Sequence, residues 1–556
     1  MRLTLFKRTH VLPLIVFFAI LLRFVGISWG LPFPFHPDEW NMATSVSQLS
    51  WQEKLNPHFF AYGQFPLYLT YFSAKGYNLL PWIHLKEITV SEAIFFLRFW
   101  STVAGVLSVI LTYLITRKLL PNNLALCAAL IATFTPGLIQ NSHFGTTESI
   151  LTLGFLGTLY CSLLILEKPR FRFYLLAALF LAIALGSKIT AVVFLAPLAS
   201  ASLFQLLRLK RKEIFIYFLS SLILALTLTL VLSPYLILNF DETKRIIAYE
   251  AQIATGKIPV FYTRQFIDTS PILFQLQKVF PYALGWPIML LGGLGVIIAI
   301  LSQAKNYLEK QKMNNVDFSW LVIVVSFWVY FFFQAFLFTK WTRFMAPISP
   351  FFAVFSALSV SKIAQKFTKG KVLVLYLVFT SIAILPGVIF SSIYLKPDIR
   401  FVASEWMFKN IPSNSKVLSE TGNVVDLPVF SQKSFSTNYH LEVISFDFYQ
   451  LDEKPEAFTK LLEDLENSDY IFVPSRRIFA NHLRLPQKYP LAAKYYELLF
   501  SGKLGFKEIK VFQPFSYLAG DEFAEETWTV FDHPTIRIYK KNESLSQKEY
   551  ANLFKN

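Results

Sequence analysis

The sequence predicts a polytopic α-helical membrane protein with a separate C-terminal α/β domain. Of its 556 residues, 54% are hydrophobic, 17% are aromatic and 16% are charged, and the mean hydropathy is +0.46. Soluble globular domains carry about 25% charged residues, so this composition excludes an ordinary soluble enzyme. The two cysteines, Cys127 and Cys161, both lie in apolar runs, which excludes a disulfide framework and a cysteine zinc site.

The formal net charge of +16 comes from the apolar part of the chain. Residues 396–556 contain 20 Lys and Arg against 22 Asp and Glu, so all of the basic excess lies in residues 1–395. Positive charge on the loops between apolar segments orients membrane helices. The charge therefore predicts a membrane orientation, and nucleic acid is not an expected partner.

About eleven segments are apolar and long enough to cross a bilayer, which takes about 20 residues. They are 11–30, 99–116, 124–141, 150–166, 173–187, 189–207, 214–236, 280–302, 319–338, 348–364 and 371–392. The two segments that meet at Gly186-Ser187-Lys188 can also be one long broken helix. The first segment is too long for a cleaved signal peptide, so we interpret it as a retained helix.

Basic clusters occur at every second junction, from Lys7 and Arg8 to Lys369 and Lys371. The positive-inside rule places these junctions and the N-terminus in the cytoplasm of a multi-pass plasma-membrane protein. The alternate junctions then face outward, and they hold the long polar segments and most of the unusual residues. These junctions are 31–98, 142–149, the turn at Lys188, 239–279, 339–347 and the tail.

The tail has the composition of a soluble domain, and about 160 residues suffice for one hydrophobic core. Its patterns predict helices at 404–410 and 491–500 and strands at 416–420, 470–474 and 535–539. We therefore expect two domains, a transmembrane domain over 1–392 and an extracytoplasmic α/β domain over 393–556. The acids at Asp447, Asp452 and 463–466 are expected to form a solvated face.

Carboxylates stand out at two outward junctions. Asp38 and Glu39 follow the first span directly, and partial desolvation at the membrane surface can make such a carboxylate a useful base. The alternative is a solvated acidic turn. Glu148 begins a span, where an ionisable residue normally faces a bundle interior or a cavity. Its alternative is a helix-capping carboxylate, which the preceding threonines make plausible.

Basic residues on the outward side are few. Lys188 lies in a tight turn, Lys340 and Arg343 precede a helix, and Arg23 and Arg98 lie in or beside the first two spans. Each alone is expected to be a snorkelling anchor. If several converge on one face, they form a clamp for a phosphate group.

A metal site has weaker support. His36, His58, His84 and His143 are all expected on the outward side, but none of them has the His-x-x-x-His spacing of a metal-binding helix. The sequence therefore neither predicts nor excludes a bound divalent ion, and it identifies no definite cofactor. No Gly-rich phosphate loop is present, so soluble nucleotides are not expected substrates.

The order of several motifs resembles the GT-C membrane glycosyltransferases. The resemblance is to the branch with the family 39 protein mannosyltransferases and the lipid A aminoarabinose transferase, and above all to bacterial RgtA/B/C/D-like, phospholipid-carrier-dependent enzymes. The motifs are His36-Pro37-Asp38-Glu39, Phe144-Gly145-Thr146-Thr147-Glu148, Gly186-Ser187-Lys188-Ile189-Thr190-Ala191, Pro234-Tyr235, Lys340-Trp341-Thr342-Arg343-Phe344-Met345-Ala346-Pro347, Tyr262-Thr263-Arg264-Gln265-Phe266, Gly285-Trp286-Pro287 and Phe531-Asp532-His533-Pro534-Thr535-Ile536-Arg537-Ile538-Tyr539.

The resemblance implies a GT-C fold and a role for each matched residue. Asp38 is expected to be the general base on the acceptor hydroxyl, Glu39 to orient the acceptor or help to bind a metal, and Glu148 to be the second acid. A substrate-binding role is expected for His36, Lys188, Tyr235, Lys340, Arg343 and Arg98, with the lipid-phosphate leaving group held by Lys188, Lys340 and Arg343. His143 stands where such enzymes more often have Arg.

The expected function is inverting transfer of a sugar from a polyprenyl-phosphate carrier to a glycan, lipid or protein acceptor of the cell envelope, as in lipopolysaccharide modification or protein glycosylation. Fixed cations would stabilise the phosphate leaving group, and one carboxylate would act as base. The first alternative is a transporter or flippase for a lipid-linked sugar, which would place broken helices near the membrane midplane. The second is a non-catalytic membrane protein whose outer domain binds glycans or partners.

Overall fold

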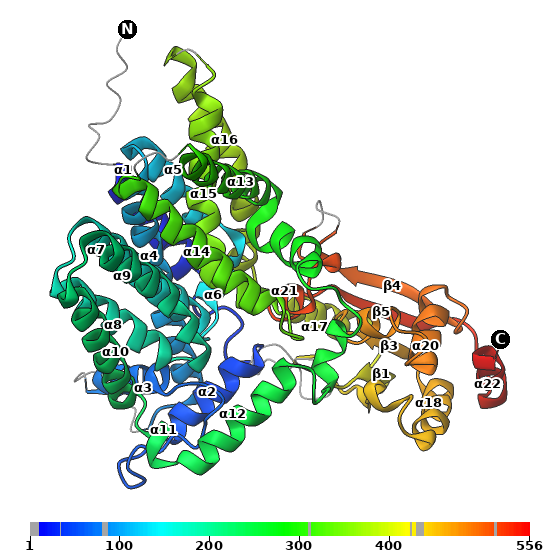
Figure 1. The fold of residues 1–556 in the computed structure, drawn as a ribbon. Coiled ribbons are helices and arrows are strands. Elements are labelled where there is room, and N and C mark those ends of the chain that lie inside the picture. The colour runs from blue at the N-terminus through cyan, green and yellow to red at the C-terminus, as the bar shows by residue number, and fades with distance from the viewer. Residues whose placement is uncertain are drawn as a thin grey trace. The chain divides into compact units, whose positions relative to one another are not determined.

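The chain folds into two compact units (Figure 1). The computed structural model describes residues 11–33, 35–79, 87–309, 313–367, 369–422, 425–429, 439–515 and 520–555. We call the first unit the helical unit; it comprises Met1–Ser28, Asp38–Ile258 and Thr269–Ser392. The second, the sheet unit, comprises Trp29–Pro37, Pro259–Asp268 and Ile393–Asn556. Two short segments from the first part of the chain therefore fold with the tail.

The helical unit contains the membrane-spanning segments. Its helices are α1 Val11–Phe24, α2 Pro37–Gln48, α3 Phe65–Asn78, α4 Val90–Leu119, α5 Asn122–Thr133, α6 Pro136–His143, α7 Glu148–Glu167, α8 Phe171–Leu185, α9 Leu195–Leu209, α10 Lys212–Leu232, α11 Tyr235–Leu238, α12 Phe240–Ala254, α13 Trp286–Leu308, α14 Asn315–Ala335, α15 Ser349–Ala364 and α16 Lys369–Ser391. Within the described residues, eight helices are long and apolar enough to cross a membrane, and the bent pair α5–α6 makes a ninth. The shorter apolar helices α1 and α8 match the two remaining predicted spans, so every predicted span coincides with a helix.

A bend of 52° separates α5 from α6. Pro136 has no N–H group, so it cannot donate to the carbonyl of Ala132 four residues earlier. The guanidinium of Arg23 replaces that donor, with Nη2 3.2 Å from Ala132 O and Nη1 3.1 Å from Thr133 O. Arg23 is fully buried, and the expectation that it is a snorkelling anchor is therefore wrong.

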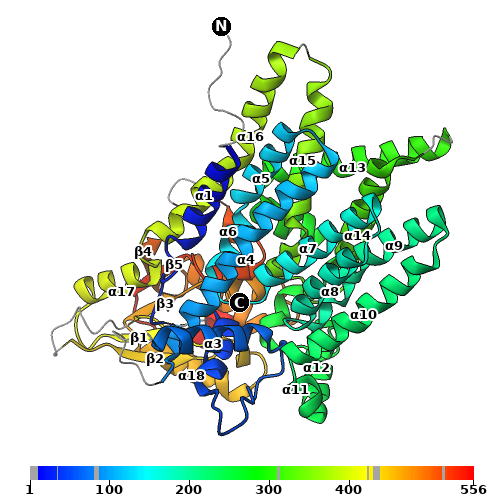
Figure 2. The ribbon, with the colours of Figure 1, turned by 90° about the vertical axis from the view of Figure 1, so that its left-hand side faces the viewer.

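Residues 173–207 form two helices, not one broken helix. The chain leaves α8 at Leu185, turns through Gly186-Ser187-Lys188 and continues as a 3₁₀ turn over Ile189–Phe194 before α9 begins. Both α8 and α9 pack against α10 (Figure 2). The turn thus presents Lys188 at the ends of two neighbouring helices.

The sheet unit is an α/β domain. Its five-stranded sheet has the order β2-β1-β3-β5-β4, with β2, β1 and β3 parallel and β5 antiparallel to β3 and β4. The strands are β1 Lys416–Glu420, β2 Glu442–Phe446, β3 Tyr470–Val473, β4 Phe506–Phe512 and β5 Ile536–Lys541, and the helices are α17 Ile399–Asn410, α18 Pro455–Asn467, α19 Phe479–His482, α20 Pro490–Phe500, α21 Glu526–Val530 and α22 Gln547–Lys555. The five elements expected in the tail are all present, whereas β2, β4 and α18 were not predicted.

Each face of the sheet has its own hydrophobic core, because successive strand residues point to opposite faces. Val417 and Phe472 pack with Met407 of α17 on one face. Leu418 and Ile471 pack on the other face, together with buried residues of α18, α20 and α22. Asp452 accepts hydrogen bonds from the first backbone amides of α20, so this acid caps a helix.

The segment Pro259–Asp268 is held in the sheet unit by two polar side chains. Arg264 pairs with Glu453, and its Nη1 also donates to His482 Nε2 at 3.0 Å. Burial and the charge of Arg264 together lower the pKa of His482 to about 4, so the neutral ring can accept this bond. Gln265 bonds to the Glu525 carboxylate and to the Glu526 backbone amide.

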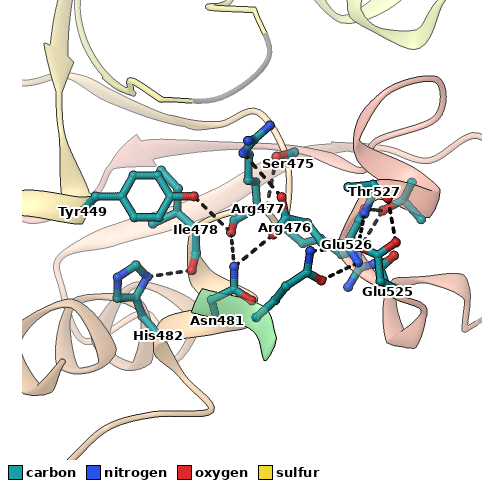
Figure 3. A network of polar contacts seen from close by, with 12 residues as sticks. Tyr449, Ser475, Arg476, Arg477, Ile478, Asn481, His482, Glu525, Glu526 and Thr527 are labelled. Atoms are coloured by element: carbon teal, nitrogen blue, oxygen red, sulfur yellow. Dashed lines mark hydrogen bonds and ion pairs between the residues drawn. The ribbon is translucent and has the colours of Figure 1, made fainter. Parts of the chain in front are cut away.

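Buried charged side chains around α21 form a further set of polar contacts in the sheet unit (Figure 3). Arg477 pairs with Glu526 at 3.4 Å, and Asn481 donates to the same carboxylate at 3.0 Å. Arg476 donates to Thr529 and to the carbonyls of residues 524 and 525. Every one of these arginine contacts lies inside the sheet unit, so they stabilise its loops.

Candidate functional site

Asp38 lies in the first turn of α2, in the helical unit, and is contacted from two distant segments. The hydroxyl of Tyr62 donates to Asp38 Oδ2 at 2.9 Å, and Arg343 forms an ion pair with the same oxygen. The side chain of Asp38 is 24% exposed and that of Arg343 is 15% exposed. The pair is therefore shielded but not sealed from solvent.

A second ion pair lies beside the first. Lys188 Nζ is 3.6 Å from Glu148 Oε1, and it also stands over the rings of Tyr62 at 5.1 Å and Phe344 at 4.4 Å. Tyr62 therefore touches both ion pairs, since its hydroxyl contacts Asp38. We call Asp38, Tyr62, Glu148, Lys188 and Arg343 the charged cluster.

Glu148 is the first residue of α7, and the capping position belongs to Thr147. Glu148 Oε2 is buried and has no hydrogen-bond partner within the described part of the chain. A buried carboxylate oxygen without a partner is costly. This oxygen is therefore available to a hydroxyl group of a bound molecule.

Burial controls the protonation of the groups outside the spans. Burial lowers the pKa of Lys188, while the Glu148 carboxylate opposes this change. Burial also raises the pKa of Tyr62, and the negative charge of Asp38 raises it further. Tyr62 consequently stays a neutral donor to Asp38.

Lys340 is a buried cation near the cluster in sequence. It is 4% exposed, and its Nζ donates to Phe338 O at 3.0 Å and to Thr269 Oγ1 at 3.3 Å. It forms no ion pair with any residue that the structure describes, and burial lowers its pKa to about 8. A buried ammonium without a carboxylate indicates a site that favours an anion.

Glu39 and Arg98 bind each other. Arg98 Nε and Nη2 donate to the two oxygens of Glu39 at 2.7 and 2.8 Å, and the amide of Gly145 donates to Oε1 at 2.6 Å. Both side chains are almost completely buried. This bidentate pair fixes α2 to α4 and to the 142–149 junction, which favours a positioning role for both residues over contact with a substrate.

Tyr235 also makes structural contacts. Its hydroxyl donates to Lys54 O at 2.8 Å, and its backbone amide donates to Gln64 Oε1 at 2.9 Å. Ser233 accepts from the Gln64 amide and donates to Gly186 O. These bonds join the first outward junction to the turn that carries Lys188.

Each of the described histidines from the sequence prediction has contacts of its own. His36 belongs to the sheet unit, where its ring lies 4.2 Å from that of Phe531. His58 pairs with the exposed Glu53, and His143 bonds to the carbonyls of residues 25 and 139. His84 lies outside the described residues. Among those that are described, no group of three or more His, Cys, Asp or Glu side chains is placed to hold a metal ion.

Tyr62 and Glu250 were not among the site residues predicted from the sequence. Tyr62 lies in an aromatic stretch of the first loop that carries no motif. Glu250 lies on α12, and burial, followed by the charge of Asp38, raises its pKa. Lys188 and Arg343 also act on Glu250, so a further carboxylate lies within electrostatic range of the charged cluster. Its position on a polar helix gave no signal, because such acids are usually solvated.

Comparison with known proteins identifies a family segment and a fold. Residues 80–236 match the model of a family described as dolichyl-phosphate-mannose-protein mannosyltransferase. No curated protein sequence matches the chain.

Solved structures match most of the chain at low identity. The oligosaccharyltransferase of Archaeoglobus fulgidus in its apo form aligns at 13% identity and a TM-score of 0.51, over 89% of this chain and 73% of that one. The same organism's AglB in complex with an inhibitory peptide and a dolichol-phosphate aligns at 13% identity and 0.51, over 88% and 72%. ArnT from Cupriavidus metallidurans bound to undecaprenyl phosphate aligns at 10% identity and a TM-score of 0.44, over 95% of this chain and 98% of that one.

The Asp38, Glu148 and Lys188 motifs thus occur in a chain whose fold is that of a membrane oligosaccharyltransferase, and two of the three lie in the matched segment 80–236. The resemblance expected from the sequence is confirmed at the level of the fold: the chain is a membrane protein of the GT-C fold, and its residues 80–236 match the model of the dolichyl-phosphate-mannose-protein mannosyltransferase family.

Proposed function

We propose that the chain is an inverting glycosyltransferase that moves a sugar from a polyprenyl-phosphate carrier to a hydroxyl or amide group of a glycan, lipid or protein acceptor. The observation that carries the proposal is the ion pair between Asp38 and Arg343 inside the charged cluster. It joins a carboxylate that can act as base to a guanidinium that can bind phosphate. The matched mannosyltransferase family and the AglB structure with dolichol-phosphate support a lipid-phosphate donor.

The cations of the site fit the leaving group. When the glycosidic bond breaks, the carrier's phosphate gains negative charge, and fixed cations stabilise that charge more in the transition state than in the ground state. Arg343 can bind phosphate oxygens in a bidentate manner, whereas Lys188 and Lys340 act as point charges. Lys340 forms no ion pair with a carboxylate among the described residues, so it would not have to break one to bind a phosphate. A bound phosphate would therefore offset the cost of burying the ammonium group.

The Asp38–Arg343 pair also links donor binding to base catalysis. Arg343 forms an ion pair with the Asp38 oxygen that would take the acceptor's proton. A phosphate competes for the same guanidinium, and its arrival would release Asp38 to accept that proton. The acceptor oxygen or nitrogen then attacks the anomeric carbon from the side opposite the phosphate, the bond to the phosphate oxygen breaks, and the configuration is inverted.

The remaining carboxylates have separate roles in this proposal. Glu148 holds Lys188 through Oε1 and offers its unpartnered Oε2 to a hydroxyl of the sugar. Glu39 positions the helix that carries Asp38 through its bonds to Arg98 and Gly145. The divalent ion left open by the sequence takes no part in the steps described.

The proposed membrane arrangement follows from charge. The basic junctions lie in the cytoplasm by the positive-inside rule, which places the charged cluster and the domain over 393–556 on the outer side. The phosphate of a lipid carrier lies at the membrane surface, and the cluster residues lie at helix ends or in the junctions between spans.

The first test measures the release of free polyprenyl phosphate by purified protein given a panel of polyprenyl-phosphate sugars and candidate acceptors. Asp38→Asn should lower turnover by about 10²–10⁴-fold, the usual contribution of a general base. Because the neutral amide holds Arg343 less firmly, donor binding should be at least as tight as in the wild type. Glu53→Gln is the matched control, since it makes the same chemical change on an exposed carboxylate of the same loop.

Near wild-type turnover in Asp38→Asn would remove Asp38 from the role of base. A wild-type protein that binds donors but never releases the carrier, with binding unchanged in Asp38→Asn, would favour the lipid-linked sugar transporter.

A further inference from the structure

The sheet unit contains a pocket of about 630 Å³, within the size range of small-ligand sites. Its wall includes Trp29, Ile393 and Phe512, and so offers two aromatic side chains and one aliphatic side chain. Trp29 and Ile393 are buried, and Phe512 ends β4. A molecule in this pocket would contact a predominantly apolar surface.

The charged groups of the wall leave a positive excess. Asp398 is paired with Arg400 at 2.7 Å, and Asp532 is paired with His533. Lys396 and Lys510 also line the pocket, and neither forms an ion pair with a carboxylate of the described residues. The two lysines therefore give the pocket a net charge of the sign that attracts an anion.

His533 is a buried cation of the pocket wall that is already paired with acids. Burial alone would lower its pKa, but the negative charges of Asp532 and Asp521 raise it to about 9. The ring is therefore protonated at neutral pH and forms ion pairs with both carboxylates. Asp532, the acid of this group that lines the pocket, therefore pairs with His533, and neither acid forms an ion pair with Lys396 or Lys510 among the described residues.

The pocket wall includes a residue from the last turn of a membrane span. The last apolar span runs from Val374 to Leu395, so Ile393 belongs both to the final turn of that span and to the pocket wall. Lys396 follows the span directly, and a lysine at a helix end reaches the headgroup region of a bilayer. An anion that reaches this wall from the bilayer would be a lipid headgroup.

We propose that this pocket binds the phosphate-bearing headgroup of a membrane lipid, with Lys396 and Lys510 holding the phosphate and Trp29 packing against the apolar part of the lipid. The inference concerns residues that have no part in the proposed transfer reaction, and it holds whether or not that reaction is correct.

The test titrates the detergent-purified full chain with phosphatidic acid and counts bound lipid by native mass spectrometry. The wild type should retain one phosphatidic acid molecule per chain in preference to diacylglycerol, which has the same chains without the phosphate. The double variant Lys396→Ala/Lys510→Ala should bind phosphatidic acid about 30-fold more weakly, since each lysine near an anionic membrane surface contributes about fivefold. Both lysines are exposed, so the fold should tolerate their loss.

Two further variants separate the pocket from general charge. Lys503→Ala/Lys548→Ala removes two exposed lysines of the same unit that do not line the pocket, and binding should be unchanged. Val402→Trp fills the pocket from a partly exposed position without altering charge, and it should block binding.

Three results would overturn the proposal. One is equal retention of phosphatidic acid in the wild type, Lys396→Ala/Lys510→Ala and Val402→Trp. Another is equal retention of diacylglycerol and phosphatidic acid by the wild type. The third is displacement of phosphatidic acid by an equal concentration of glycerol 3-phosphate, which would assign the pocket to a water-soluble phosphate ester.

Discussion

Neutralising Glu39 should destabilise the helical unit more than the same change at the neighbouring Asp38. Glu39 is fully buried and shares both of its oxygens with Arg98. The amide in Glu39→Gln keeps the size of the side chain but leaves the Arg98 guanidinium as an uncompensated buried charge. Breaking a buried pair in this way costs about 3–5 kcal/mol. Asp38 is 24% exposed and Arg343 is 15% exposed, so solvent partly screens this pair, and Asp38→Asn should cost less than Glu39→Gln.

The assay is thermal unfolding of the purified protein in detergent, with both single variants compared with the wild type. The double variant Glu39→Gln/Arg98→Met removes both charges, and it should recover much of the stability lost in Glu39→Gln because no buried charge is left unpaired. An unchanged midpoint in Glu39→Gln, or a larger loss in Asp38→Asn than in Glu39→Gln, would refute the assignment of Glu39 to a positioning role.

Two further predictions concern backbone packing and a buried histidine. A Cβ at Gly63 would lie 2.1 Å from Gly186 O, so Gly63→Ala should shift the turn that carries Lys188 and lower the rate of sugar transfer at least tenfold. Gly76→Ala is the control, because no atom lies within 4 Å of the added carbon, and it should keep full activity. Neighbouring carboxylates raise the pKa of His533 to about 9 against a burial effect of opposite sign, so its contribution to stability is complete below about pH 6.5 and is lost as the pH rises through 9. This pH-dependent loss of stability is about 3 kcal/mol, at about 1.4 kcal/mol per pKa unit. His533→Gln should therefore flatten the decline in stability when thermal unfolding is measured from pH 6 to 10. An unchanged pH profile would show that His533 is not charged in the folded protein.

The sequence predicted the spans well because a long apolar run has few alternatives in a membrane protein. Each of the eleven predicted spans coincides with a helix. The sheet strands β2 and β4 were missed, since β4 is exposed along most of its length and has no clear hydrophobic alternation. Edge strands of this kind are fixed by pairing with a neighbour, and a single sequence does not contain that information.

The sequence by itself was enough to select the charged residues at the outward junctions as candidates for the functional site, because charged residues are rare and costly in an apolar chain. It was not enough to assign their roles. Asp38 and Glu39 are adjacent in sequence, yet one pairs with Arg343 and the other is sealed against Arg98. Arg23 donates hydrogen bonds to the carbonyls at a helix bend and Arg98 forms an ion pair with a carboxylate, although the sequence predicted that both would be membrane anchors. Ion pairs join residues up to 305 positions apart in the sequence. Only the packing of the helices decides which charged residues come together. Packing has this effect because electrostatic attraction is short-ranged where water is present and strong where the fold excludes water.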